Sequence, residues 1–232
     1  MIPVRKLISQ FADIVFPVTC VCCGCAAASE NKYICDWCEN ERFEYAHPEQ
    51  GDILPDIVQT QFSLWNFDKG GYLQQMLHDL KYNNLKEVGV ELGYILGKKF
   101  IRSCSVNSIS HIENKKPVIV PIPLHQSKQR KRGFNQARAI GMGIQRATNW
   151  EIIDMGTILR VKNTKTQTGL NLAQRSDNLK SAFKLVHENW IKEVIPVIAD
   201  DVFTTGATTF ELAKTLADHG SGKSVILTVA KA

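Results

Sequence analysis

Two adjacent carboxylates, Asp200 and Asp201, directly follow an apolar run at residues 194–199. A run of small hydroxyl residues around a glycine, TTGATT, comes shortly after them and leads into an amphipathic helical pattern. Carboxylates accept hydrogen bonds from hydroxyl groups, whereas backbone N–H groups at a helix N-terminus bind anions. The stretch therefore predicts a ligand with a phosphate beside a vicinal diol, as in ribose 5-phosphate.

A helix cap is the simpler explanation of the same residues, because Asp and Thr are common at N-cap positions. One cap uses one residue, Asp201 or Thr204, and leaves the second acid and the other threonines unexplained. Gly206 allows a tight turn that brings the backbone close to a ligand. We expect Asp200 and Asp201 to hold the sugar. The residues expected at the phosphate are Thr204, Thr205, Gly206, Ala207 and Thr208.

Short continuous apolar runs alternate with helical patterns along the chain, as in PVIVPIP, VIPVIA and SVILTVA. This alternation predicts an α/β fold with a central, mainly parallel sheet covered on both faces. Ligands of such sheets bind at the carboxyl ends of strands, which is where the two acids stand. A helix expected at about 86–102 has glycine at positions 89, 93 and 97, which indicates close backbone packing against a neighbour.

The 232 residues, 44% of them hydrophobic, can form one substantial core with a small appendage. We expect an N-terminal helix and zinc-binding module at 1–45, a linker at 46–60 and the α/β domain at 61–232. No apolar run reaches the roughly 18 residues of a membrane span. The first 17 residues are too polar for a secretory signal, so we expect a cytoplasmic protein.

The net charge of +5 is unevenly distributed. Residues 117–184 contain twelve Lys or Arg and three Asp or Glu, which indicates an anionic ligand: phosphates, nucleic acid or both. A solvated basic surface is the alternative. We assign Arg132, beside the turn at Gly133, to the phosphate site, because guanidinium groups bind phosphate oxygens in bidentate fashion. Lys128, Arg130 and Lys131 are assigned to single-stranded nucleic acid.

Six of the seven cysteines fall between positions 20 and 38, which in a cytoplasmic chain indicates a metal site rather than disulfides. Four thiolates in a C-x2-C-x11-C-x2-C pattern suit a tetrahedral structural zinc. These expected ligands are Cys20, Cys23, Cys35 and Cys38. Cys22 and Cys25 form a second C-x2-C frame. Cys104 is expected to be buried and inert.

The stretch 194–220 resembles the 5-phosphoribosyl-1-pyrophosphate (PRPP) motif of type I phosphoribosyltransferases in its hydrophobic lead, acidic pair and TTGAT turn. The resemblance implies Asp200 and Asp201 on the ribose hydroxyls, the turn on the 5-phosphate, and Mg²⁺ bound with PRPP. HDLKY, VPIPLHQSKQRKRGFNQA, ILRVKNTKTQTGLNLAQRSDNLKSAF and the front cysteines resemble the ComF/GntX group. Its pattern places a glycine after the second cysteine, which favours the Cys20–Cys23 frame.

ComF proteins are linked to natural transformation, in which single-stranded DNA enters the cytoplasm, and GntX to gluconate use. The resemblance thus implies a PRPP-binding, phosphoribosyltransferase-like protein of DNA uptake, with other competence proteins as partners. If the protein is an enzyme, its catalytic residues are expected to be Asp200, Asp201 and Arg132. The sequence does not identify the acceptor of the phosphoribosyl group. The alternatives are a non-catalytic single-stranded DNA-binding factor that senses PRPP, and a metabolic phosphoribosyltransferase. A polar loop bracketed by Arg160 and Asn178, with Gln167 and Arg175, could close over a ligand.

Overall fold

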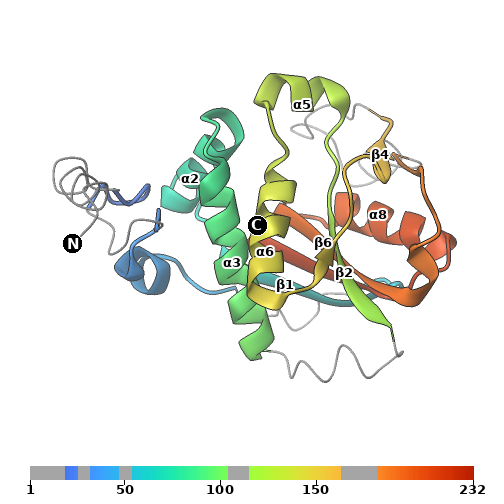
Figure 1. The fold of residues 1–232 in the computed structure, drawn as a ribbon. Helices are drawn as coiled ribbons and strands as arrows, with labels where there is room; N and C mark the ends of the chain where they lie inside the picture. The colour runs from blue at the N-terminus through green and yellow to red at the C-terminus, as the bar shows by residue number, and fades with distance from the viewer. Residues whose placement is uncertain (1–18, 26–31, 47–53, 104–114, 163–181) are drawn as a thin grey trace, which may run out of the picture.

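A five-stranded parallel sheet forms the centre of the protein (Figure 1). The structure, a computed structural model, describes residues 19–25, 32–46, 54–103, 115–162 and 182–232. The strand order is β1 (Val58–Asn66), β7 (Ser224–Lys231), β6 (Val194–Phe203), β2 (Lys116–Pro121) and β3 (Glu151–Ile152). Every neighbouring pair is parallel. The predicted α/β class with a mainly parallel sheet is confirmed.

Helices cover both faces of this sheet (Figure 1). The helices α2 (Tyr72–Tyr82), α3 (Lys86–Ser103) and α6 (Gln136–Thr148) share one apolar core with Val197 of β6. Ile198, the next residue of the strand, belongs to a second core with α8 (Ala207–Asp218). Successive side chains of a strand point to opposite faces, so β6 is buried from both sides, as its continuous apolar run predicts.

Glycines bring α3 and α6 into backbone contact. A Cβ on Gly93 of α3 would overlap the carbonyl group of Ile140, and one on Gly143 of α6 would overlap the carbonyl oxygen of Val90. The close packing predicted from the glycine spacing of α3 is confirmed. The sequence interpretation did not identify Gly143, which makes the contact reciprocal.

The residues after β2, Gln126–Arg132, form the helix α5. The imidazole Nδ1 of His125 accepts a hydrogen bond from the Ser127 amide at 3.3 Å, and Gly133 ends the helix with φ 78°. This helix buries no residue, so it has no apolar periodicity to reveal it. Asn135 then caps α6 by accepting from the Ala137 amide at 3.0 Å.

The strands β4 (Ile158–Arg160) and β5 (Phe183–Leu185) form a separate antiparallel pair. Two short helical turns, η1 (Cys38–Arg42) and η2 (Ile191–Glu193), complete the described elements. None of the helices in the described ranges combines the length and the hydropathy that a membrane crossing requires.

Several predictions concern residues outside the described ranges. They are the helix near the N-terminus and residues 47–53 of the linker expected at 46–60. The individual residues are Cys104, Gln167, Arg175 and Asn178.

Candidate functional site

The two acids lie within the last residues of β6 rather than after its end. The sequence interpretation ended this strand at residue 199, but parallel pairing with β7 continues past Asp200 to Phe203. Asp201 therefore points toward the face that carries α2 and α3, and Asp200 toward the face that carries α8. The two carboxyl groups are still close enough to interact with each other.

Asp201 is buried and paired with Lys81 from α2. Its side chain is 8% exposed, and its Oδ2 forms an ion pair with the Lys81 ammonium. Burial by itself would raise the pKa of Asp201, but the charge and hydrogen bond of Lys81 outweigh burial, so the pKa is lowered. Burial likewise opposes the charge on Lys81, yet Asp201, followed by Asp200, holds its pKa above the usual value. The sequence interpretation gave Lys81 no role.

Among the described residues, Asp200 forms no ion pair like that of Asp201 with Lys81, although the Lys81 charge also acts on it. It accepts a hydrogen bond from the Asp201 amide at 2.9 Å. Burial, and then the negative charge of Asp201, raise the pKa of Asp200 well above its usual value. Arg160 of β4 acts on Asp200 through its positive charge. The Asp200 carboxylate is therefore a group that hydroxyl donors or a cation would stabilise in its ionised form.

The turn after β6 begins α8 at a glycine and has a buried hydroxyl close by. Gly206 adopts φ 70° as the N-cap of α8, and no side chain caps this helix, which excludes the single-cap explanation. The Thr205 hydroxyl is buried and, within the described part of the chain, has no hydrogen-bond partner. The Thr209 hydroxyl is occupied, since it donates to the Gly206 carbonyl at 2.9 Å. A hollow of about 40 Å³ lies between Asp200 and this turn.

Positive side chains from two further elements approach the acids. Arg132, the last residue of α5, acts on both Lys81 and Asp201 by its charge. Burial, and then the charges of Arg160 and Arg132, lower the pKa of Lys128. Lys128, which the sequence interpretation grouped with Arg130 and Lys131, is thus close to the site. Those other two residues are exposed.

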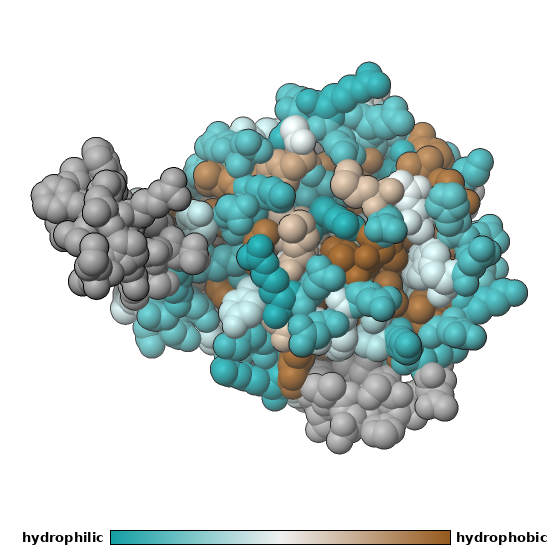
Figure 2. Space-filling model, in the orientation of Figure 1, coloured by the Kyte–Doolittle hydropathy of each residue, from teal (hydrophilic) through white to brown (hydrophobic). Residues whose placement is uncertain are grey.

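A groove of about 870 Å³ runs between α5 and the β4 segment. Arg130, Arg138 and Arg160 line it together with the exposed apolar side chains of Met155 and Leu159. Figure 2 shows hydrophobic residues at the surface in the region of β4, on a face that is otherwise mainly hydrophilic. Arg160 belongs both to this groove and to the surroundings of Asp200, so the groove opens next to the acidic pair.

Asp200→Asn is expected to raise the melting temperature at neutral pH. A group whose folded-state pKa is raised holds its proton longer in the folded than in the unfolded chain, so its ionisation lowers the free energy of unfolding. The asparagine removes this cost, and its advantage should disappear below about pH 4, where the unfolded carboxyl is also protonated. Thermal denaturation from pH 4 to pH 8 measures the effect. Asp218→Asn, at the exposed end of α8, is the control and should show no such trend.

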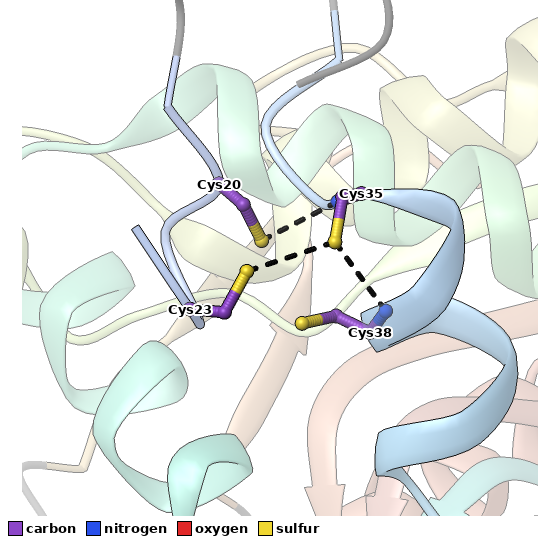
Figure 3. A group of neighbouring side chains, drawn as sticks. All are labelled: Cys20, Cys23, Cys35 and Cys38. Carbon is purple, nitrogen blue, oxygen red and sulfur yellow. Dashed lines mark hydrogen bonds between the residues drawn. The ribbon is translucent and has the colours of Figure 1, made fainter. Parts of the chain in front are cut away.

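Four cysteine sulfurs form a cluster in the N-terminal segment (Figure 3). The Sγ atoms all lie within 4.8 Å of one another, so they could hold a metal ion. The four residues are those predicted: Cys20, Cys23, Cys35 and Cys38. Burial would raise the pKa of Cys20, but hydrogen bonds from backbone amides, first that of Cys35, lower it to about 6.

The second C-x2-C frame lies outside this cluster. The Cys22 sulfur is directed to the Met76 sulfur of α2 at 3.7 Å, and Cys25 is exposed. Burial, followed by the charge of Cys20, raises the pKa of Cys22 to about 12, which disfavours the thiolate that binds metals. The geometry therefore favours the Cys20–Cys23 frame over the Cys22–Cys25 frame.

The cysteine segment packs on the α/β domain. The Glu91 carboxylate of α3 accepts hydrogen bonds from the amides of Tyr33 and Ile34. The Phe43 ring lies 4.7 Å from the Trp65 ring of β1, and Ile34 belongs to the same core as that tryptophan. The predicted boundaries at 45 and 60 stay predictions.

Known proteins resemble this chain over different lengths. No family model matches it. It is 40% identical to Competence protein F of Haemophilus influenzae over 105 residues, which is 44% of each chain. It is 28% identical to DNA utilization protein YhgH of Escherichia coli K12 over 202 residues, 87% of this chain and 86% of that protein. Competence protein ComFC of Bacillus subtilis is 28% identical over 110 residues, 47% and 41% of the two chains.

The chain is similar to proteins of the ComF family, and the names of these relatives support its membership of that family. It spans less than half the length of the Haemophilus protein in that match, and most of the length of YhgH. Among solved structures, the allosteric regulatory enzyme of purine biosynthesis matches with a TM-score of 0.38 and 14% identity, over 61% of this chain and 26% of the enzyme.

Proposed function

We propose that this chain binds PRPP with Mg²⁺ at the β6 acids and acts in the uptake and handling of DNA. The observation that carries the proposal is the position of Asp200, a half-buried acid beside Asp201 that lines one hollow together with the turn at Gly206. Ribose hydroxyls would donate to Asp200 and Asp201. The 5-phosphate would accept from the turn, where the Thr205 hydroxyl lacks a partner among the described residues and Gly206 opens the helix N-terminus.

The donor set fits magnesium in the presence of PRPP. Mg²⁺ takes oxygen ligands and is commonly shared between one or two carboxylates and substrate phosphates. Asp200 would supply the carboxylate ligand, because Asp201 already forms an ion pair with Lys81. When bound, Mg²⁺ would neutralise charge on the phosphates. Arg132, Lys128 and Arg160 supply fixed positive charge around the same place.

Catalysis is one form of this proposal. In it, the C1–O bond of PRPP breaks, pyrophosphate leaves with the bonding electron pair, and a nucleophilic nitrogen of an acceptor bonds to C1. Asp200 and Asp201 would orient the ribose, and Arg132 would stabilise the departing charge. Release of pyrophosphate from PRPP in the presence of nucleobases or amines tests this form.

Two other forms share the same PRPP site. A non-catalytic DNA-binding factor would bind PRPP without turnover, as a ligand sensor. A metabolic, GntX-like phosphoribosyltransferase would turn over PRPP without binding DNA. The names of the relatives, Competence protein F and DNA utilization protein, favour a role with DNA. Competence proteins as partners and a cytoplasmic location are part of the proposal.

The four-cysteine cluster is proposed to hold one structural zinc ion. Zinc in structural sites is tetrahedral and is commonly bound by four thiolates, with no open position for substrate. Two of the ligands, Cys20 and Cys38, are buried, which suits a closed site. A structural role agrees with the packing of this segment on α3 and β1.

Single-stranded nucleic acid is expected to bind through α5 in a salt-dependent manner. Changing Lys128, Arg130 and Lys131 together to Glu should weaken binding of an oligonucleotide at least tenfold at low salt, because each phosphate contact releases counterions. The slope of affinity against salt should also become shallower. Electrophoretic mobility shift or fluorescence anisotropy at several salt concentrations gives both readouts.

A matched triple variant on α3 serves as the control. Lys86, Lys98 and Arg102 are exposed cations on that helix, and their change to Glu alters the net charge by the same amount. Equal losses in the two triple variants would mean that only net charge matters. Binding by the wild type that does not respond to salt would contradict the assignment to α5.

A further inference from the structure

The outer face of α2 carries exposed aromatic rings that the proposed function does not use. The inner face of this helix is buried by Leu73, Met76, Leu77 and Leu80. Tyr72 is 51% exposed and Tyr82 is 52% exposed, and His78 lies between them on the solvent side. Ten residues separate the two tyrosines, which is about 15 Å along an α-helix.

Each tyrosine is accompanied by an arginine and a second ring. The Arg42 guanidinium lies 3.9 Å from the centroid of Tyr72 and 4.7 Å from that of Trp37, which is 57% exposed. At the other end, the Arg132 guanidinium lies 5.5 Å from the Tyr82 centroid. The His78 ring is 4.7 Å from the same tyrosine. Two aromatic clusters, each with a guanidinium group, thus mark the ends of α2.

The helix connects the cysteine segment to the acidic pair. Figure 1 shows α2 between the N-terminal segment and α5. Trp37 and Arg42 belong to the cysteine segment, whereas Lys81, next to Tyr82, forms the ion pair with Asp201. A ligand that follows the outer face of α2 from Trp37 would arrive at the carboxyl edge of the sheet.

Each end of this face has a positive side chain, Arg42 at one end and Arg132 at the other. Lys81 lies at the border of the face and is already paired with Asp201. Acidic side chains are also present: Glu41 is exposed beside Arg42, and the Asp79 carboxylate accepts from the side-chain amides of Gln75 and Asn83 at 3.0 Å and lies 3.6 Å from the His78 ring. These contacts offset the charge of Asp79, so it is not a bare carboxylate on the surface.

We propose that the outer face of α2, from Trp37 and Tyr72 to Tyr82, is a stacking surface for single-stranded nucleic acid that leads to Asp200 and Asp201. The inference rests on the proposed function. It gives the nucleic acid a second binding surface in addition to α5. A strand bound along it would run from the cysteine segment toward the acidic pair. Unpaired bases stack on exposed aromatic rings with little regard to sequence, while neighbouring cations hold the backbone phosphates. Bases in a duplex are stacked on one another, so the surface selects single strands.

Tyrosine substitutions test this surface. Tyr72→Ala and Tyr82→Ala should each weaken binding of a fluorescently labelled 20-nucleotide oligothymidylate by about tenfold, the range expected for loss of one base–ring stack. Tyr72→Phe and Tyr82→Phe keep the ring and should bind like the wild type. Tyr94→Ala is the matched control, because Tyr94 is an exposed helical tyrosine of α3 with a cation, Lys98, 5.2 Å from its ring.

The results separate this inference from the function on which it rests. Wild-type affinity in both alanine variants, or an equal loss in Tyr94→Ala, would overturn the stacking surface while leaving the α5 assignment in place. Weaker binding in the phenylalanine variants would also overturn it, since the ring would not be what matters. PRPP binding by Tyr72→Ala, measured by calorimetry with Mg²⁺, should be unchanged. A wild type that binds no oligothymidylate at low salt would overturn the nucleic-acid role and the surface together.

Discussion

Cys35→Ser is expected to release the bound metal ion and unfold the segment around residues 20–43. Metal binding and folding are one equilibrium in such small sites, with apparent binding free energies of about 10–16 kcal/mol for structural zinc. Cys35 lies centrally in the cluster: its sulfur is 3.7 Å from that of Cys23, and its amide is 3.3 Å from the Cys20 sulfur. Metal analysis of the purified protein and limited proteolysis measure the two effects.

The second cysteine frame supplies the control for this experiment. Cys22→Ser and Cys25→Ser should retain one metal ion per chain, because neither residue joins the cluster. The α/β domain should remain folded in Cys35→Ser, but with a lower melting temperature, since Ile34 and Phe43 share its core. A wild-type protein purified without zinc, with its thiols paired as disulfides, would be the contrary result.

The parts of the site that are contiguous in sequence could be predicted. The apolar run, the acids and the glycine turn form β6 and the start of α8, because strand burial, turn conformation and helix start are local properties. The cysteine cluster was also predicted, since the spacing within each C-x2-C pair is a local feature of the sequence. The exact end of β6 was not, because pairing with β7 beyond Asp200 depends on a strand more than twenty residues away.

The partners of the acids could not be predicted in the same way. Lys81 and Arg160 reach Asp201 and Asp200 only through the packing of α2 and β4. A weak signal for Lys81 exists, because it follows Leu77 by four residues and therefore lies at the border of the buried stripe of α2. A lysine in that place requires a partner, but sequence alone does not say which carboxylate supplies it.

The largest effect on ligand binding is expected from the β6 carboxylates. Asp200→Ala and Asp201→Ala should each cost about 1.5–3 kcal/mol of PRPP binding, the range for a hydrogen bond to a charged group, which is tenfold or more in affinity. Removing both should cost more than either alone. Gly206→Val should be as damaging, because φ 70° is strained for a β-branched residue and its Cβ would overlap the Phe210 ring. Calorimetry with PRPP and Mg²⁺ measures all four variants.

Folding must be separated from binding at Asp201, because its loss leaves the Lys81 ammonium without its partner. Asp201→Ala should therefore also lower the melting temperature, whereas Asp200→Ala should not, since the ionised Asp200 carboxylate is itself unfavourable in the folded chain. Asp200→Ala is thus the cleaner test. This variant should be at least as stable as the wild type and should bind PRPP more weakly. Asp218→Ala is the control and should bind normally. If Asp200→Ala binds PRPP as tightly as the wild type, the Asp200 carboxylate does not hold the ribose, and the presence of two adjacent acids near the end of β6 needs another explanation.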